Sequence, residues 1–389
     1  MMQAGLEPLT PDEAIHGEKV AAHLRALIAG AGGWIRFSQF MHGALYAPGI
    51  GYYMTKRDRF GWAGDFTTSP ELSPLFARCL AVQIAEIFRR TGGGDLIEHG
   101  AGSGRLAFDL LEALERLGAL PRRYRIVDVS PALRADQRKL LAAAPVPVDW
   151  LDAPPAETWR GVVVANEVAD ALPVDRFRIT HGGCEAMGVV ANGDAFAWSA
   201  RPADAQLSAV VAALNARLPE PMAQGFVSEW CPGLPAWTAG IGASLEQGAL
   251  LIADYGLPRT HYYHPSRPNG TLCGIHRHFD VPDPLERTGI QDLSAWVDFS
   301  AIADVGRANG FEVAGFATQA HAMASLGVDR ELAAMQDGVS ESRRLRLAQA
   351  AQQLILPGEM GESFKLLALT RGIDPQLAAF AFRDLSSSL

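Results

Sequence analysis

Residues 95–106 read DLIEHGAGSGRL, and the fold expected for this chain follows from them. The stretch begins with a short apolar segment typical of a buried strand, passes through three glycines and leads into a helical pattern. Glycines between a strand and a helix let the backbone approach a ligand closely, because no side chain stands in the way. The stretch therefore predicts a strand–loop–helix unit that binds a ligand at the carboxyl end of its strand.

The spacing of these glycines separates two classes of cofactor. The dinucleotide fingerprint G-x-G-x-x-G needs a glycine where this chain has Arg105, which counts against a nicotinamide oxidoreductase. Glycines at alternate positions, with an acid two residues ahead, form the loop of S-adenosylmethionine-dependent methyltransferases. A carboxylate suits the cationic amino-acid part of that methyl donor better than it suits a pyrophosphate. The residues expected to bind S-adenosylmethionine, with S-adenosylhomocysteine as the product, are Glu98, Gly100, Ala101, Gly102 and Gly104.

Further apolar segments alternate with helical patterns on both sides of this loop. Strands are expected at 124–130, 146–150, 161–166 and 248–256, and helices at 75–90, 106–117 and 300–309. Alternating strands and helices imply a parallel sheet, and right-handed crossovers place the carboxyl ends of its strands along one edge. The expected fold class is α/β, with a Rossmann-like parallel-sheet core of the class I methyltransferase type.

Two of these strands end in residues suited to the nucleoside part of the donor. Asp128, at the end of the second strand, can accept hydrogen bonds from both ribose hydroxyls, a role that NAD-binding proteins share. Trp150 and Leu151 follow the third strand, where an adenine would be sandwiched. For Trp150, a core aromatic at a strand end is an equally good interpretation, so both interpretations stay open.

The fourth strand leads into NEVADALP, residues 166–173. An amide and two carboxylates at the end of a buried strand are costly in a core unless they are satisfied or used. We therefore expect Asn166 to contact the cofactor, and Glu167 and Asp170 to act on the methyl acceptor. The structural alternative makes Asp170 a helix N-cap and Glu167 a solvated loop residue.

The chain is expected to divide into an N-terminal helical and lid segment, residues 1–90, and a methyltransferase core, residues 91–389. The core carries insertions at about 174–247 and 257–298, both placed near its ligand-binding edge. Antiparallel strands with glycine-rich turns are expected inside the first insertion, at 177–180, 185–190 and 194–200.

The N-terminal segment begins with a helical pattern at 12–30. The stretch 35–74 is rich in aromatic residues and glycine, which predicts a packed, irregular lid rather than a flexible linker. Thr67, Ser69 and Pro70 lie in it and are expected to touch the cofactor. The alternative is that Ser69 and Pro70 open the following helix as its N-cap and first residue.

Composition narrows the class of partner. The 389 residues carry 34 Lys+Arg against 43 Asp+Glu, a formal net charge of −9, which argues against a general binder of nucleic acid or anionic membranes. The four cysteines form no C-x-x-C pair, and neither an apolar stretch of about 20 residues nor a secretory signal is recognisable. We therefore expect a cytoplasmic protein without membrane insertion. His276-x-His278 has no clear third ligand, so no metal is expected, and the pair is interpreted as exposed on a strand or as an acceptor contact.

Blocks spread over nearly the whole chain closely resemble the MidA-like methyltransferases, a family that includes a mitochondrial protein arginine methyltransferase serving respiratory complex I assembly. The blocks are GYYM (51–54), RFGWAGDFTTSPELSPLF (59–76), EHGAGSGRLAFDLL (98–111), NEVADALPVDRF (166–177), GTLCGIHRH (270–278), QDLSAWVDF (291–299) and PGEMGESFK (357–365). GDFTTSPELSPLF and NEVADALP are the distinctive ones. One block departs from the family: members often have His where this chain reads AWVDF (295–299), so no catalytic histidine is carried over to position 296.

The resemblance implies S-adenosylmethionine as methyl donor and a protein arginine as acceptor, with a respiratory complex subunit as one candidate substrate. Glu167 and Asp170 could fork onto a guanidinium and hold it in line with the methyl group. Two other classes stay open: an NAD-dependent oxidoreductase, and a non-catalytic assembly factor or scaffold that keeps the cofactor fold. The aromatic N-terminal segment and the hairpin insertion fit substrate docking and homodimer formation equally.

Overall fold

The computed structural model describes residues 7–56, 59, 61, 64–65 and 67–389. Its contacts divide the chain into two compact units. Unit 1 comprises Met1–Phe66, Asp170–Leu234 and Arg259–Trp296; unit 2 comprises Thr67–Ala169, Pro235–Pro258 and Val297–Leu389. Of the block 59–76, residues 60, 62–63 and 66 lie outside the described residues.

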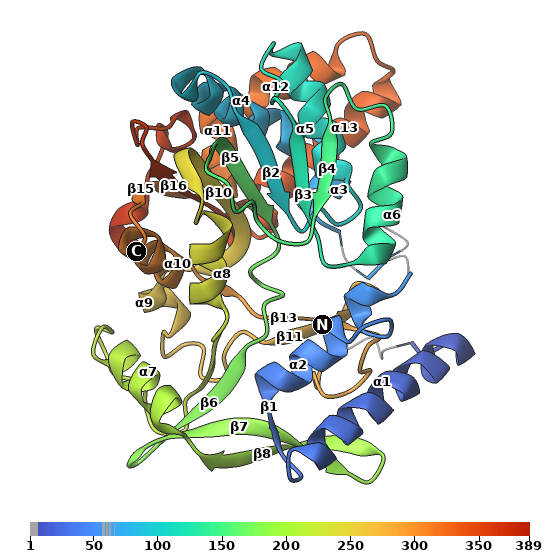
Figure 1. Ribbon diagram of the computed structural model, residues 1–389, viewed down its shortest axis with the longest axis vertical. Coiled ribbons are helices and arrows are strands. Elements are labelled where there is room, and N and C mark those ends of the chain that lie inside the picture. The colour runs from blue at the N-terminus through green and yellow to red at the C-terminus, as the bar shows by residue number, and fades with distance from the viewer. Residues whose placement is uncertain (1–6, 57–58, 60, 62–63, 66) are drawn as a thin grey trace. The chain divides into compact units, whose positions relative to one another are not determined.

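Unit 2 is built on one large sheet, drawn in Figure 1. Its strands are β2 (Asp95–His99), β3 (Tyr124–Val127), β4 (Val148–Leu151), β5 (Trp159–Asn166), β10 (Leu245–Leu257), β14 (Val297–Asp298), β15 (Glu312–Thr318) and β16 (Phe364–Arg371). The order is β15-β16-β10-β5-β2-β3-β4, with β14 beside β10. The strands from β10 to β4 are parallel, whereas β16 runs antiparallel to both of its neighbours. The predicted parallel sheet is thus confirmed, and its strand ends share one edge.

Helices connect these strands and cover the sheet. They are α3 (Ser69–Leu72), α4 (Pro74–Thr91), α5 (Arg105–Arg116), α6 (Pro131–Leu140), α8 (Leu234–Ile241), α10 (Phe299–Ala308), α11 (Gln319–Ser325), α12 (Val328–Gln336), α13 (Glu341–Ile355) and α14 (Met360–Ser363), followed by the short turns η2 (Ala378–Phe380) and η3 (Ser386–Ser388). The helices expected from the periodicity at 75–90, 106–117 and 300–309 correspond to α4, α5 and α10.

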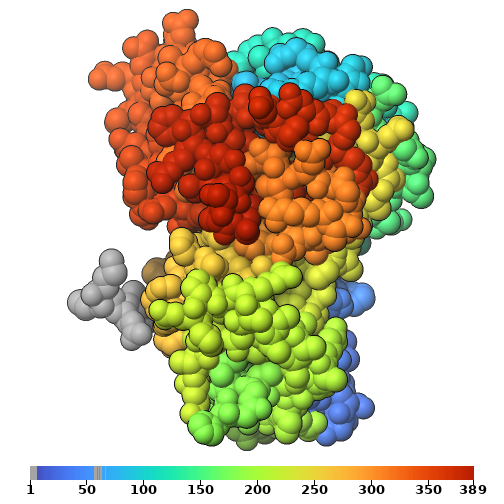
Figure 2. Space-filling view, turned by 90° about the vertical axis from the view of Figure 1, so that its left-hand side faces the viewer, coloured from blue at the N-terminus to red at the C-terminus, as the bar shows by residue number. Residues whose placement is uncertain are grey.

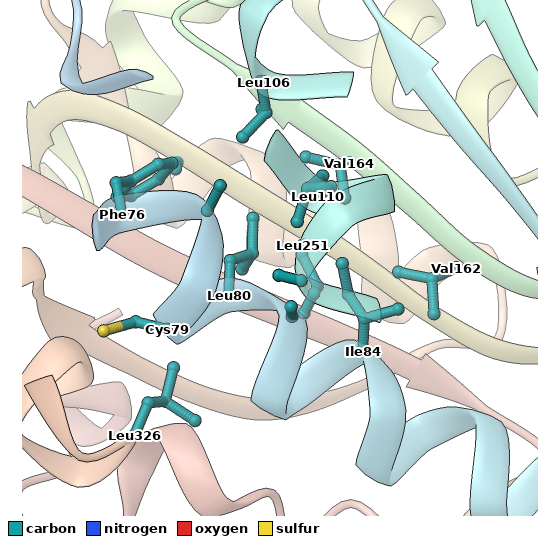
Figure 3. Close-up of a cluster of buried hydrophobic side chains, with 14 of the residues drawn as sticks. Phe76, Cys79, Leu80, Ile84, Leu106, Leu110, Val162, Val164, Leu251 and Leu326 are labelled. Carbon is teal, nitrogen blue, oxygen red and sulfur yellow. The ribbon is translucent and has the colours of Figure 1, made fainter. Parts of the chain in front are cut away.

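The core of unit 2 lies where α4 and α5 pack on the sheet, as Figure 3 shows. Leu80 and Ile84 of α4 are four residues apart and therefore share one helix face. They are buried against Leu110 of α5 and against Val162 and Val164 of β5. Because the side chains of a strand alternate between faces, the residues between these valines point to the opposite face of the sheet. A second apolar layer covers that face.

That second layer includes α10. Its Phe299 packs on Phe316 of β15 with ring centroids 5.1 Å apart, and both side chains are fully buried. Val163, between the two valines of the first layer, is also fully buried. Both faces of the sheet are therefore apolar, which explains why its strands read as continuous hydrophobic runs.

The outer edge of β15 is covered by the C-terminal segment. The N–H of Phe316 donates to Oδ1 of Asp384 at 3.0 Å, and the N–H of Leu385 donates to the carbonyl oxygen of Phe316 at 2.6 Å. Figure 2 shows the C-terminal residues, in red, at the surface of the molecule. This cover satisfies backbone groups that an edge strand would otherwise expose.

Unit 1 combines the N-terminal residues with strands from both insertions. Its elements are α1 (Pro11–Gly30), β1 (Ile35–Arg36), α2 (Phe37–Tyr46), η1 (Tyr52–Met54), β6 (Asp175–Thr180), β7 (Gly183–Asn192), β8 (Ala195–Pro202), α7 (Ala205–Asn215), β9 (Val227–Trp230), α9 (Arg259–Tyr262), β11 (Cys273–His276), β12 (Phe279–Val281) and β13 (Asp292–Ser294). One sheet has the order β1-β7-β6-β9, with β8 beside β7, and the other has the order β12-β11-β13. The antiparallel strands expected in the first insertion are present as β6, β7 and β8.

The structure differs from the sequence-based expectation in the stretch 35–74. Where an irregular lid was expected, residues 37–46 form the buried helix α2. Ser69 and Pro70 open only the four-residue α3, because Ser73 is extended and caps a separate helix, α4, accepting a hydrogen bond from the N–H of Leu75 at 3.2 Å.

The division into units also differs from the expected boundary at residue 90. α4 groups with unit 2 because it packs on the sheet, while residues 170–234 and 259–296 of the two insertions group with the N-terminal residues. Within the described ranges, no helix combines the length and apolar character needed to cross a membrane.

Candidate functional site

The loop after β2 has glycine at three positions because its backbone takes φ values there that other residues rarely adopt. Gly100, Gly102 and Gly104 have φ of +65°, +53° and +85°. A Cβ at Gly100 would lie 2.8 Å from the side chain of Val168, so close packing also excludes a larger residue. Gly104 is the N-cap of α5 and has no side chain of its own, while the N–H of Arg105, the first residue of the helix, donates to Oγ of Ser103 at 3.2 Å. A helix end of this kind favours an anionic group such as a carboxylate.

Glu98 lies at the end of β2 and is 2% exposed. The hydroxyl of Tyr124 donates a 2.7 Å hydrogen bond to its Oε2. Burial raises the pKa of the Glu98 carboxyl to about 7, and the negative charge of Asp128 adds to this rise. A buried carboxylate with such a pKa favours a cationic partner, because a cation would stabilise its ionised form. Ala101, by contrast, packs into the core cluster of unit 2.

Asp128 follows β3 and is also buried. Its Oδ1 accepts a hydrogen bond from the N–H of Ser130 at 2.9 Å, and its Oδ2 accepts one from Nε2 of Gln137 at 2.8 Å. Burial raises the pKa of this carboxyl, and these hydrogen bonds act in the opposite direction. Next to it, the apolar side chain of Val129 is 63% exposed. The sequence analysis did not single out Val129, although this apolar residue directly follows Asp128, which it did single out.

Trp150 and Leu151 belong to β4. The Trp150 ring packs against the core cluster, donates its N–H to Oε1 of Gln137 at 2.9 Å, and has the Arg138 guanidinium 4.9 Å from its centroid. The carbonyl oxygen of Leu151 accepts a hydrogen bond from Nη2 of Arg134 at 2.6 Å. These contacts fix both residues at the strand end, and their contact with an adenine stays a prediction.

β5 delivers Asn166 and Glu167 to the same edge of the sheet. Glu167 has φ of +54°, an unusual value for a residue with a side chain. Its N–H donates to the carbonyl oxygen of Ala253 at 2.8 Å, which ties the turn to β10. Its Oε1 accepts hydrogen bonds from Nδ2 of Asn166 at 3.0 Å and from the N–H of Ser69 at 3.3 Å. The Glu167 carboxylate is therefore a held group and not a solvated loop side chain.

Ser69 and Pro70 are buried in α3, and Thr67 before them is half-buried. The Ser69 hydroxyl donates to Oε1 of Gln319 at 3.1 Å. The structure thus brings Ser69 to Glu167 through its backbone N–H and leaves the contact of these three residues with a cofactor as a prediction.

Asp170 belongs to unit 1 and is 6% exposed. Its carbonyl oxygen accepts a hydrogen bond from the N–H of Ala295 at 3.0 Å. In the same unit, burial raises the pKa of the Asp292 carboxyl to about 7, and the Asp170 charge contributes to that rise. Joint action of Asp170 and Glu167 on one substrate remains a prediction.

The interpretation of His276 as an exposed strand residue is wrong. His276 is buried, with its Nε2 at 3.2 Å from Oε1 of Glu13 and its Nδ1 at 2.6 Å from Nη1 of Arg287. His278, by contrast, is exposed. Within the described part of the chain, no three His, Cys, Asp or Glu side chains gather as metal ligands.

Asp254, at the end of β10, holds the turn that carries Glu167. It is 1% exposed, and its Oδ2 accepts hydrogen bonds from the N–H groups of Val168 at 3.2 Å and Ala169 at 3.0 Å. Its Oδ1 accepts from the N–H of Tyr255 at 2.9 Å. These contacts are turn chemistry, and they fix the turn in which Glu167 lies.

Replacing Asp254 with asparagine should therefore weaken both the fold and the activity. The amide presents N–H groups to a backbone donor, so we expect the free energy of unfolding to fall by roughly 1–3 kcal/mol. Misplacement of Glu167 should lower kcat by roughly tenfold or more. Thermal melts and initial rates measure the two effects, with Asp304→Asn on α10 as the control. An Asp254→Asn enzyme with the wild-type kcat would contradict this role.

A parallel sheet with one antiparallel strand, a glycine loop after β2 and an acid after β3 defines a class I S-adenosylmethionine-dependent methyltransferase. The family model described as "Putative S-adenosyl-L-methionine-dependent methyltransferase" matches residues 79–317, and the chain belongs to this family. The methyl donor is therefore S-adenosylmethionine.

Known relatives and solved structures agree with this assignment. The chain is 28% identical to the protein arginine methyltransferase NDUFAF7, mitochondrial, of Danio rerio, over 90% of this chain and 87% of the relative. It is 30% identical to the Bos taurus protein of the same name, over 87% and 80%. A crystal structure from Burkholderia thailandensis with S-adenosyl-homocysteine bound is 41% identical, covers 99% of this chain and 100% of its own, and has a TM-score of 0.92.

The residues present fit this cofactor. Glu98 offers a buried carboxylate to a cation, and Asp128 offers a second one at the neighbouring strand end. Asn166 presents a buried Oδ1 that no donor among the described residues reaches, so an acceptor is left for a ligand. Without side chains, the glycines of the loop leave room for close approach.

Proposed function

We propose that this methyltransferase acts on an arginine side chain of a protein, and that a subunit of a respiratory complex is the acceptor. The relatives named protein arginine methyltransferase support the acceptor type. The observation that carries the proposal is the Glu167 carboxylate, held at the end of β5 by the N–H of Ser69 and by Asn166. The choice of a respiratory complex subunit as acceptor rests on the resemblance of the sequence blocks to the MidA-like methyltransferases.

The chemistry of arginine requires such a carboxylate. A guanidinium has a pKa above about 12, so at neutral pH its nitrogens carry delocalised positive charge and are weak nucleophiles. In the proposed mechanism, Glu167 accepts hydrogen bonds from the guanidinium, localises its charge away from the reacting nitrogen and takes up the proton that this nitrogen loses. Asp170 is proposed as the second carboxylate on the same group. S-adenosylmethionine, when bound, supplies an electrophilic methyl group on its sulfonium.

Several residues are proposed to hold the donor. Glu98 binds its amino group, Asp128 binds both ribose hydroxyls, and Asn166 accepts a further hydrogen bond. The remaining cofactor contacts come from Gly100, Ala101, Gly102, Gly104, Trp150, Leu151, Thr67, Ser69 and Pro70.

The acceptor is tested with a donor labelled in its methyl group. We expect label on arginine, seen as a mass increase and located by fragmentation, when the enzyme is incubated with purified respiratory complex subunits. Matched peptides with lysine in place of arginine should stay unlabelled. Calorimetric titration with S-adenosylhomocysteine, with NAD as the control ligand, shows that the protein is folded. Label on lysine alone, or no label although S-adenosylhomocysteine binds, overturns the arginine assignment.

We further propose that the protein acts in the cytoplasm, where the four free cysteines of the chain fit a reducing environment. The relatives are named mitochondrial, so cell fractionation decides this point. Size-exclusion chromatography with light scattering tests whether a homodimer forms.

A further inference from the structure

Gln137 is a buried polar residue that the mechanism above does not use. It is fully buried, whereas all the other residues of α6 are exposed or half-buried. A polar side chain in such a place is costly unless all of its hydrogen-bonding groups are used. Its partners are therefore informative.

The three partners of Gln137 have fixed polarity. Its Nε2 donates to the carbonyl oxygen of Gly102 at 2.9 Å and to Oδ2 of Asp128 at 2.8 Å. Its Oε1 accepts a hydrogen bond from the indole N–H of Trp150 at 2.9 Å. The carbonyl and the carboxylate only accept, and the indole only donates. The place therefore requires a group with two donors and one acceptor, which a side-chain amide supplies and a carboxylate does not.

These partners belong to three different strand ends of unit 2. Gly102 is in the loop after β2, Asp128 follows β3, and Trp150 is in β4. The loop also packs closely on Gln137, since a Cβ at Gly104 would lie 3.2 Å from its Cγ. One side chain thus links the glycine loop, the ribose carboxylate and the aromatic ring.

We propose that Gln137 is the positioning residue of the methyl-donor site, which orients Asp128 toward the ribose and keeps its carboxylate ionised while fixing the glycine loop. The proposal rests on the proposed role of Asp128 as the ribose ligand. Loss of the Nε2 donor leaves a buried carboxylate with one hydrogen bond fewer, which favours its protonated form. Gln137 itself need not touch the donor.

Other charges around Asp128 set the background for a test by pH. Glu98 on β2 is negative when ionised, and its own pKa is raised to about 7. Arg134 on α6 favours the ionised form of Asp128, and its Nη1 is paired with Asp152 at 2.8 Å. These groups are present in the wild type and in every variant at position 137. The informative quantity is therefore the ratio of variant to wild-type affinity at each pH.

The experiment is calorimetric titration of the full chain with S-adenosylhomocysteine between pH 6 and 8. Gln137→Met should weaken binding roughly tenfold to a hundredfold, the usual range for a lost hydrogen bond to a charged group. Its affinity relative to the wild type should fall further as the pH decreases, because loss of the Nε2 donor favours the protonated form of Asp128. Gln137→Glu should show the opposite slope, because a proton shared by the two carboxyls restores one donor at low pH. With S-adenosylmethionine, the KM should rise while kcat at saturation stays within about threefold.

The matched control is Gln83→Met. Gln83 is also fully buried, and it donates to Oε2 of Glu86 and accepts from the N–H of Ala379, both at 2.8 Å. This variant should lose thermal stability like Gln137→Met but keep the wild-type affinity and pH dependence.

Two results overturn the inference. The first is that neither variant at position 137 weakens binding; the second is that both affinity ratios are independent of pH or slope in the same direction. Asp128→Asn separates this failure from that of the site. If that variant binds S-adenosylhomocysteine as tightly as the wild type, Asp128 is not the ribose ligand, and the inference about Gln137 fails as well. If it binds weakly while Gln137→Met does not, the inference about Gln137 fails alone.

Discussion

Replacing Glu167 with glutamine should lower methyl transfer by roughly a hundredfold to ten-thousandfold, the range seen when a positioned general base is removed. Glutamine keeps the size of the side chain, and its carbonyl can still accept hydrogen bonds from the N–H of Ser69 and from Asn166. It cannot take up a proton or pair with a guanidinium charge. Affinity for S-adenosylhomocysteine should stay within about threefold, because the proposed role of Glu167 concerns the acceptor.

The measurement is the single-turnover rate with labelled donor, together with calorimetry. Glu115→Gln is the matched control, since Glu115 is exposed near the far end of α5, about ten residues and therefore roughly 15 Å from the glycine loop. A Glu167→Gln enzyme with the rate of the control variant would show that Glu167 is not catalytic. Rates restored at high pH would indicate that the carboxylate serves only to remove a proton.

The sequence was sufficient to predict the parallel strands β2, β3, β4, β5 and β10 of unit 2, for physical reasons. Its strands are buried on both faces, so 161–166 reads as an apolar run, while the helix at 75–90 keeps one apolar face. Strand order could not be deduced from such local patterns. The antiparallel β16 lies between β10 and β15 because of tertiary packing, which no local pattern shows.

Unit 1 was harder to predict because its parts are distant in sequence. The two residues of β1 pair with Val189 and Gly188 of β7, and no local pattern marks such a pairing. The helix α2 did carry a signal: Phe37, Phe40, Met41 and Ala44 recur at helical spacing and are all buried. The density of aromatic residues and glycine around it concealed that periodicity.

For the candidate site, residues at strand ends could be singled out because parallel strands bring their carboxyl ends together. The structure places Glu98, Asp128 and Glu167 at such strand ends, and their roles stay predictions. Gln137 could not be found, because a glutamine in the middle of a polar helix resembles any solvated residue until its burial is known. The backbone contacts of Asp254 likewise depend on the register of β10 against β5.

Replacing Glu98 with glutamine should stabilise the free protein at pH 8 and impair cofactor binding. Burial raises the pKa of this carboxyl from 4.5 to about 7. Between these values the folded state binds more protons than the unfolded state, so ionisation of Glu98 lowers stability as the pH rises through that window, and the full cost is present above pH 7. Glutamine carries no charge and can still accept the hydrogen bond from Tyr124. The gain in unfolding free energy should be on the order of 3 kcal/mol at pH 8 and should vanish near pH 4.

Urea unfolding at pH 4 and pH 8 measures this gain, with Glu115→Gln as the control. A Glu98→Gln protein no more stable than the wild type at pH 8 would mean that the buried carboxylate is stabilised by neighbouring groups of the free protein. Its pKa would then not be raised.

The same substitution should reverse its effect once the ligand is present. If Glu98 binds the amino group of the donor, its buried charge destabilises the free wild-type protein and forms a favourable contact only in the complex. The cation then lowers the pKa of the Glu98 carboxyl on binding. Wild-type affinity for S-adenosylhomocysteine should then fall as the pH decreases below about 7, because a proton must leave before the cation binds. Glu98→Gln should bind roughly tenfold to a hundredfold more weakly at pH 8, as expected for a lost charge-assisted hydrogen bond. Its affinity should lack this pH dependence, whereas equal affinities and equal slopes for the two proteins would place the amino group elsewhere.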